Sequence, residues 1–185
     1  MNKFFKTAAL AAILLSANSI IAQDSKTGTT TLNVNLGSVL AIEVANPSVT
    51  IQMTTAAHLR DGNSSSELSD HVKVTATEGY TVTVQASTDL TNGGVEIPVS
   101  TVKIKTEKGS YLGASGSTAP TTTPTFPTTE PALSATAPVQ IIESSTGDFR
   151  GFNVTYTIPA EETPAYLDKA TGVYTTTLTY TIAAD

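Results

Sequence analysis

Cysteine is absent from this 185-residue sequence, and so is tryptophan. Without cysteine the chain can form neither a disulfide nor a thiol nucleophile. The fold must therefore be held by core packing and strand pairing, and it needs no oxidising compartment to form.

Positive charge is scarce. The chain has 10 Lys and Arg against 16 Asp and Glu, and two of the basic residues, Lys3 and Lys6, lie in the first 22 residues. Residues 23–185 keep eight basic and all sixteen acidic residues, a net charge of −8. Such an acidic chain is repelled by phosphates, which argues against nucleic acid and anionic membranes as partners.

The chain also lacks an apolar run of the roughly 20 residues that a membrane-spanning helix needs. Its first 22 residues, "MNKFFKTAALAAILLSANSIIA", have a basic end, a short apolar run and Ala22 at a possible cleavage site. This pattern predicts a signal peptide over residues 1–22. We expect residues 23–185 to be a single domain, secreted to the periplasm, cell surface or medium without membrane insertion.

Helical periodicity is missing except at residues 55–60, whereas apolar and polar residues alternate in most of the chain after residue 28. Several such segments predict an all-β, immunoglobulin-like antiparallel β-sandwich. We expect a hairpin turn at residues 77–79, with Gly79 in a strained conformation. The alternating segments are residues 49–53, 71–76, 80–86, 95–105, 139–142, 152–159 and 173–182. The residues expected in the core between two sheets are Val82, Val84, Phe152, Val154, Tyr156, Leu178, Tyr180 and Ile182.

The alternation begins in residues 29–44, which are too long for one ordinary strand. Gly37 and Ser38 divide them, so that Leu32, Val34 and Leu36 share one face of residues 29–36. Burying these three side chains is worth roughly 5–9 kcal/mol, a large part of a typical domain's stability. We expect them to be covered, and alternation leaves open whether their own domain or another one covers them. Residues 29–36 are therefore a candidate donor strand.

Proline is concentrated in one segment. Residues 114–138 contain five of the nine prolines together with many threonines. This composition favours extended backbone with few hydrogen bonds, and it predicts a surface loop between strands rather than a hinge between half-domains.

Motifs that carry chemistry are missing. His58 and His71 match no metal-ligand spacing, and we expect both in solvated loops. Residues 61–67 begin like a calcium loop, but they lack its glycine and its final carboxylate. Glu161 and Glu162 are adjacent, so their side chains should point apart rather than form an acid–base pair. No nucleophile elbow or phosphate-binding loop is present. We therefore expect no catalytic residue, no cofactor and no metal, and hence no enzyme.

Two parts of the chain resemble known secreted domains. Residues 152–182, "FNVTYTIPAEETPAYLDKATGVYTTTLTYTI", are similar to the end of spore coat protein U-like and related pilin-like domains. The shared features are Ile158, Pro159 and Ala160, then Gly172 and Tyr174, then Leu178, Tyr180 and Ile182. The front, "TLNVNLGSVLAIEV", resembles the start of colonisation-factor type chaperone–usher pilins, where a donor strand precedes the first strand.

This resemblance implies an exported immunoglobulin-like subunit that polymerises by head-to-tail strand exchange, with a periplasmic chaperone as a further partner. The function we expect is therefore a fimbrial or surface-fibre protein of the adhesion type. The alternatives are a monomeric secreted binding module of the same fold and, third, a carbohydrate-active protein. The third would need a carboxylate pair or an exposed aromatic patch, and the sequence provides neither.

Overall fold

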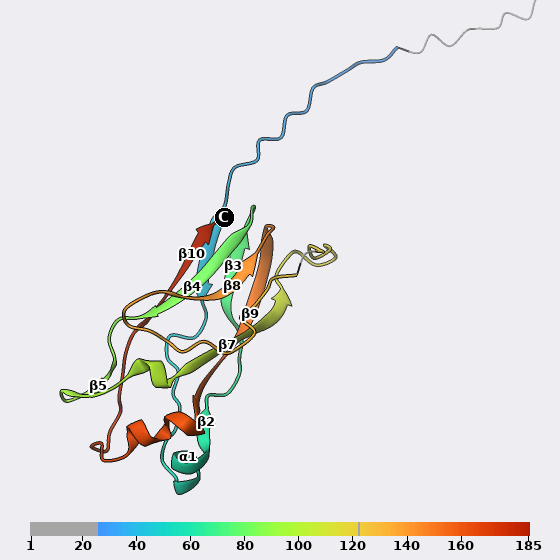
Figure 1. Ribbon diagram of the computed structural model, residues 1–185. Helices are drawn as coiled ribbons and strands as arrows, with labels where there is room; N and C mark the ends of the chain where they lie inside the picture. Colours follow the sequence, from blue (N-terminus) through green and yellow to red (C-terminus); the bar gives the residue numbers. More distant parts are fainter. Residues whose placement is uncertain (1–25, 122) are drawn as a thin grey trace, which may run out of the picture. The chain divides into compact units, whose positions relative to one another are not determined.

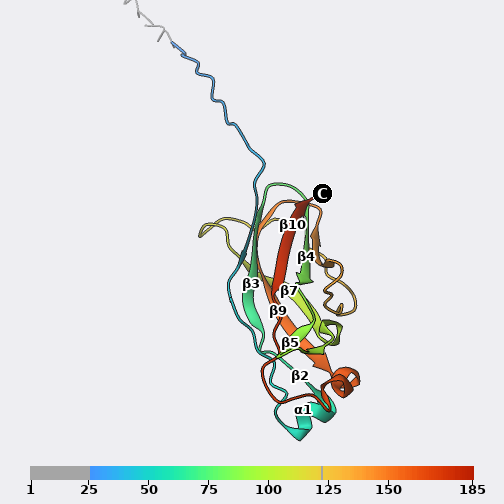
Figure 2. The ribbon, with the colours of Figure 1, turned by 90° about the vertical axis from the view of Figure 1, so that its left-hand side faces the viewer.

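The computed structural model describes residues 26–121 and 123–185, so the predicted signal peptide lies outside the described residues. Residues 36–185 form one compact unit, a sandwich of antiparallel strands (Figures 1 and 2). The prediction of an all-β sandwich is confirmed. Within the described ranges, no helix combines the length and the apolar character needed to cross a bilayer.

The first sheet is built around β9 (Asp148–Pro159), whose two edges pair with three other strands. β3 (Leu68–Ala76) lies between β9 and β1 (Leu40–Val44), which forms the outer edge. β2 (Gly62–Ser64) and β7 (Lys103–Tyr111) also pair with β9.

The second sheet has the order β10-β4-β8. These strands span Leu178–Ala184, Tyr80–Ala86 and Val139–Ser144 respectively. A separate hairpin joins β5 (Leu90–Asn92) to β6 (Val95–Ile97). Three short helices complete the structure: α1 (Ala56–Asp61), and the 3₁₀ helices η1 (Val99–Thr101) and η2 (Ala160–Tyr166).

The core lies between the two sheets and follows the predicted alternation. Five of the eight expected core residues are buried: Val82, Val84, Phe152, Val154 and Tyr156. The other three, Leu178, Tyr180 and Ile182, are half-buried and pack against the same core. All three belong to β10, which has a neighbouring strand on one side only.

The predicted hairpin at residues 77–79 is wrong, because β3 and β4 belong to different sheets. The three-residue turn passes from one layer to the other, and Gly79 has no positive φ angle. The physical reason is that alternation determines which face of a strand is buried, but not which strand lies beside it. Two consecutive strands can bury their apolar faces by packing across the core in different sheets, as here, or by pairing side by side in one sheet.

The proline-rich segment, residues 114–138, connects β7 to β8 as a loop, and part of it enters the sandwich. Thr125 exchanges two backbone hydrogen bonds with Glu143 of the second sheet, at 2.8 and 3.1 Å. The amide of Leu133 donates to the carbonyl oxygen of Val102, next to the first sheet, at 2.8 Å, and the Leu133 side chain is buried. The segment therefore closes one lateral side of the sandwich.

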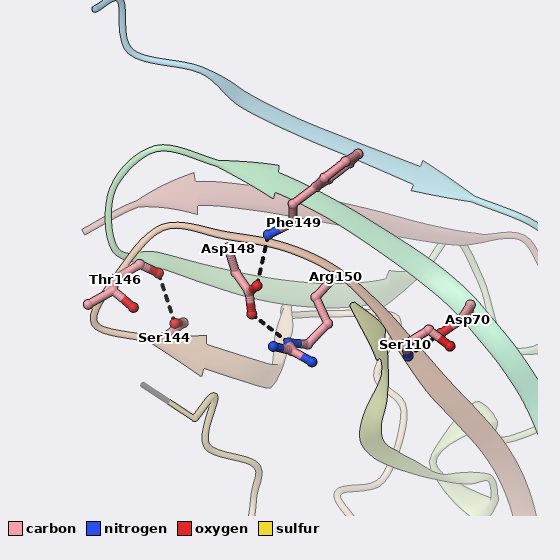
Figure 3. Close-up of polar contacts among 7 residues, drawn as sticks. All are labelled: Asp70, Ser110, Ser144, Thr146, Asp148, Phe149 and Arg150. Carbon is pink, nitrogen blue, oxygen red and sulfur yellow. Dashed lines mark hydrogen bonds and ion pairs between the residues drawn. The ribbon is translucent and has the colours of Figure 1, made fainter. Parts of the chain in front are cut away.

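A bulge in β3 is built around Asp70. The pairing register of β3 with β9 shifts between Leu68 and Val72, and Asp70 has a φ angle of +48°, which is unusual for a residue with a side chain. Its carboxylate Oδ1 accepts a hydrogen bond from the Ser110 amide at 2.8 Å (Figure 3). Its own amide donates to the Asn153 side chain at 3.0 Å. The bulge thus ties β3 to both β9 and β7.

Gly151 of β9 leaves the space that the Asp70 side chain occupies. A Cβ atom at position 151 would overlap the Cβ, Cγ and Oδ1 atoms of Asp70. We expect Gly151→Ala to lower the free energy of unfolding by about 1–3 kcal/mol, the usual cost of overpacking. Urea unfolding followed by circular dichroism measures this loss.

The matched control is Gly37→Ala, because a Cβ atom at position 37 would meet nothing within 4 Å. Asp70→Gly removes the side-chain atoms that the new methyl group would meet. It also places glycine, which readily adopts a positive φ angle, at position 70. Gly151→Ala should therefore cost little in the Asp70→Gly background. A loss as large there as in the original protein would show that the overlap with Asp70 is not the cause.

Candidate functional site

The lateral side of the sandwich opposite the proline-rich segment is open along part of its length. β1 is the edge strand of the first sheet and β10 is the edge strand of the second, and these two edges lie against each other. Beyond β1, residues 46–54 form no strand, and before β10, residues 172–177 form only an isolated bridge. A groove of about 690 Å³ lies between these two segments.

Apolar side chains of the core line the groove. Val49, Ile51 and Met53 are half-buried and alternate with exposed residues, as the sequence pattern predicts. The predicted strand at residues 49–53 is nevertheless wrong, because no neighbouring strand pairs with this segment. The other aliphatic residues that line the groove are Val44, Leu90, Val99, Val102, Leu133, Ile158, Val173 and Leu178.

Both backbone segments beside the groove have free hydrogen-bonding groups. The amide of Ala45 donates to the carbonyl oxygen of His71 at 2.8 Å. In residues 46–53, no backbone group forms a hydrogen bond with another backbone group of the described residues. On the other side, Thr175 exchanges two backbone hydrogen bonds with Thr91 of β5, and the carbonyl oxygen of Thr177 accepts one from the amide of Ser87, which follows β4. In an antiparallel pair, every second residue bonds to the partner strand, and the residues between them direct their backbone amides and carbonyls away from it. The backbone groups of residues 176, 178 and 180 therefore face the groove.

One end of the groove is polar. The His71 ring contacts the rings of Tyr156 and Tyr180 edge-on, with centroids 6.4 and 5.9 Å away. The two tyrosine hydroxyl groups, from different sheets, are hydrogen-bonded to each other. The His71 Nδ1 atom lies 3.3 Å from the Asn46 side-chain oxygen. This end therefore presents hydroxyl, imidazole and amide groups beside the apolar floor.

His71 is buried, so the prediction that it lies in a solvated loop is wrong. The bulge at Asp70 breaks the alternation, and both His71 and Val72 point into the core. Burial lowers the pKa of His71, which favours the neutral ring. Burial likewise raises the pKa of Tyr156, so this polar end carries no charge at neutral pH.

The opposite end of the groove has an exposed apolar side chain. Val173 lines it and is 76% exposed, which is unusual for a valine that stands beside a core. The Tyr166 hydroxyl group forms a hydrogen bond with the Thr101 hydroxyl group at 2.8 Å and so fixes the Tyr166 ring against this end.

The three residues of the candidate donor strand are not covered. Leu32, Val34 and Leu36 are 84%, 73% and 88% exposed, and residues 26–39 contain no helix or strand. The structure therefore describes an extended apolar segment in the same chain as an open apolar groove.

The other candidate residues have structural partners. Asp61 pairs with Arg60, Asn63 donates to the carbonyl oxygen of Gln52 at 2.6 Å, and His58 lies in α1. In the part of the chain that the structure describes, no group of three or more His, Asp or Glu side chains is placed to hold a metal ion. Glu161 pairs with Lys103 at 2.7 Å, and Glu162 also lies in η2.

The sequence shows the apolar row of the candidate donor strand, but it does not show the groove. The signal was present, since residues 49–53 and 174–180 both alternate. Alternation does not show whether another strand lies between two such segments, because that depends on which strands become neighbours.

No protein-family model matches this sequence, and no curated protein matches it. The class of this protein is therefore taken from its structure, which is an all-β sandwich with one open side.

Proposed function

We propose that this protein is a non-enzymatic, secreted structural subunit of a fimbrial or other surface fibre of the adhesion type, assembled by strand exchange. The observation that supports this is the combination, in one chain, of a groove between two backbone segments that have no strand between them and an exposed segment with alternating apolar residues. An added strand would gain backbone hydrogen bonds from the edges and bury its apolar side chains in the groove.

Chain length favours donation to a second copy. Four residue steps separate Leu36 from Leu40, and β1 then runs four further steps, about 13 Å, to Val44, where the groove begins. To turn back toward its own groove the chain must reverse at residues 37–39, which leaves Leu36 beside Leu40. The side chains of Leu32, Val34 and Leu36 therefore cannot all enter the groove of their own domain.

Donation to a neighbour makes a head-to-tail contact between two different surfaces. Such contacts generate filaments when the rotation between subunits does not close a ring. Before assembly, a periplasmic chaperone could cover the groove by supplying a strand of its own. The alternative is a monomeric secreted module whose groove binds another ligand, since its volume lies within the usual range for ligand pockets.

Removal of residues 23–36 tests this proposal. All the strands of the described residues lie after residue 36, so the truncated protein should remain folded but should no longer form polymers. Size-exclusion chromatography of the mature and truncated proteins, with and without heating in SDS, measures the difference. Adding the peptide "TTTLNVNLG" should raise the melting temperature of the truncated protein by several degrees, because the peptide fills the groove.

The matched control is the same peptide with Val34→Asp, which would bring an unpaired charge into the apolar groove and should give no stabilisation. If the truncated protein unfolds, and the native peptide rescues it no better than a scrambled one, residues 29–36 belong to their own domain and strand exchange is wrong. A mature protein that remains monomeric and whose groove takes up no peptide would favour the alternative.

A further inference from the structure

We propose that Asn92 is a site of spontaneous deamidation, where the chain converts an asparagine into aspartate and isoaspartate without an enzyme, and that this change loosens one wall of the groove. Asn92 is the last residue of β5, and Gly93 follows it in the turn to β6. Deamidation at this position does not require strand exchange, so it goes beyond the proposed function. Three features support it: the turn itself, the weak pairing of the hairpin, and the contacts of the Asn92 side chain.

The reaction is an attack within the chain. The backbone nitrogen of Gly93 adds to the Cγ atom of the Asn92 side-chain amide, and the bond from Cγ to the side-chain nitrogen breaks. That nitrogen leaves as ammonia and takes the proton of the Gly93 amide with it, which closes a succinimide ring. One water molecule then opens the ring at either of its two carbonyl carbons and returns a proton to the nitrogen. Asparagine and water thus give the acid and ammonia, with water as the only co-reactant.

The turn leaves the attacking nitrogen free. Gly93 and Gly94 join the two strands with φ angles of +57° and +85°, and both are exposed. A Cβ atom at either position would meet nothing within 4 Å. Among the described residues, the Gly93 amide has no hydrogen-bond acceptor. Because glycine has no side chain and moves readily between backbone conformations, its nitrogen can reach the side-chain carbon of the residue before it.

The hairpin that carries the turn is weakly held. β5 and β6 form a sheet of their own, and each strand has only three residues. An isolated two-stranded hairpin is marginally stable, so its tip can open while the sandwich stays folded. Ring closure requires this freedom, because the backbone after Asn92 must rotate to bring the nitrogen to Cγ.

The other asparagines of the described residues lack this combination. Asn63 precedes a serine, but it lies in β2, which pairs with β9, and its side chain donates to the carbonyl oxygen of Gln52 at 2.6 Å. Asn153 precedes a valine, whose branched side chain hinders the attack, and its side chain donates to Glu67 at 3.1 Å. The remaining asparagines, at positions 33, 35 and 46, precede valine, leucine and proline.

Asn92 lies where its conversion affects the groove. Its side-chain amide lies against Gly172, which lines the groove, and a Cβ atom at position 172 would overlap that amide. The preceding residue, Thr91, exchanges two backbone hydrogen bonds with Thr175 of the same wall, both at 3.0 Å. Aspartate would place a negative charge against this wall. Isoaspartate would add one carbon atom to the main chain directly beside the bonds between Thr91 and Thr175.

Peptide mapping of the mature full-length protein tests the modification. The protein is kept in warm, mildly alkaline buffer, and mass spectrometry follows the mass increase that replacement of the side-chain NH₂ group by OH produces. We expect Asn92 to convert at least about tenfold faster than Asn63, which corresponds to a barrier lower by about 1.4 kcal/mol. A rate at Asn92 no higher than the rate at Asn63 would overturn the proposal.

Two glycine variants form a matched pair, because both place alanine at a positive φ angle of the same turn. Gly93→Ala puts a methyl group beside the attacking nitrogen and should slow the conversion at least about tenfold. Gly94→Ala leaves that nitrogen unchanged and should not slow the conversion. Equal slowing by the two variants would show that the Gly93 nitrogen is not the attacking group, and the proposal would be wrong.

The effect on the wall has its own measurement. Protein converted at Asn92 should melt several degrees below fresh protein, because the hairpin then holds residues 172–177 less firmly. Asn92→Gln keeps an amide but closes a larger ring far more slowly, so its melting temperature should not change during the same incubation. If converted and fresh protein melt at the same temperature, the wall is unaffected, and the loosening of the groove is excluded even where the modification occurs.

Discussion

Val154→Asp is expected to unfold the domain. Val154 lies near the middle of β9, between the partner residues Leu68 of β3 and Thr106 of β7, and its side chain is fully buried. A carboxylate at this position would have no partner in the apolar core. We expect a loss of more than about 4 kcal/mol, which is comparable to the whole stability of many domains. Far-UV circular dichroism and the yield of soluble protein measure this effect.

Thr155→Asp is the matched control, because it introduces the same charge one residue further along the same strand. Thr155 lies on the opposite, partly exposed face of the sheet, next to Lys105 of β7, which pairs with Glu107 at 3.0 Å, so solvent and this lysine surround the new charge. Its stability should stay within about 0.5 kcal/mol of the original protein. A folded Val154→Asp variant with an unchanged melting temperature would contradict the burial of Val154 between the sheets.

The faces of the strands could be predicted from the sequence because burial follows a period of two. In β4, Tyr80, Val82, Val84 and Ala86 are all buried, as their alternation predicts. In β10, the alternating threonines Thr179 and Thr181 are exposed. The face of the sheet to which a side chain points depends only on its position along its own strand, so it can be predicted from the local sequence.

The neighbours of the strands could not be predicted in the same way. The turn after β3 could form a hairpin or cross between layers, and the alternation of both strands is the same in either case. The bulge at Asp70 was also hidden, because a positive φ angle is uncommon outside glycine, and aspartate, although it adopts this angle more often than most residues, does not by itself indicate it. The groups that stabilise this bulge are distant in the sequence: the Ser110 amide donates to Asp70, and Gly151 leaves space for the Asp70 side chain. Only the folded chain brings them together.

The candidate site was predictable in one half only. Leu32, Val34 and Leu36 form a recognisable apolar row in the sequence, whereas the groove is defined by residues 46–54 and 172–177, which have no strand between them. A cysteine-free sandwich with an open side loses the core contacts that a further strand would supply. This connects stability to assembly: filling the groove should stabilise the subunit as well as join it to the next one.

A buried ion pair lies near the end of the sandwich where β9 begins. Arg150 Nε donates to Asp148 Oδ2 at 2.6 Å, and the two side chains are only 3% and 2% exposed (Figure 3). Asp148 Oδ1 accepts from the Phe149 amide at 2.8 Å, and the Arg150 guanidinium group lies 5.9 Å from the centre of the Tyr111 ring. Residues 148 and 150 share one face of β9, so each charge has the other as its partner.

Arg150→Met is expected to destabilise the protein strongly. The methionine fills much of the space of the arginine stem, but it leaves the Asp148 carboxylate buried without an opposite charge. Removing one partner of a buried ion pair usually costs about 3–5 kcal/mol, because the remaining charge stays desolvated. The midpoint of urea unfolding measures the loss, provided that the slope of the transition is unchanged.

Two further variants separate the buried charge from lost packing. Asp148→Leu combined with Arg150→Met removes both charges, and this double variant should recover most of the stability, since apolar replacements of a buried pair are often neutral or stabilising. Lys73→Met breaks the exposed pair with Glu43, whose atoms lie 2.8 Å apart, and should cost less than about 1 kcal/mol. If the double variant is as unstable as Arg150→Met alone, the arginine stabilises the sandwich through its packing against Tyr111 rather than by neutralising Asp148.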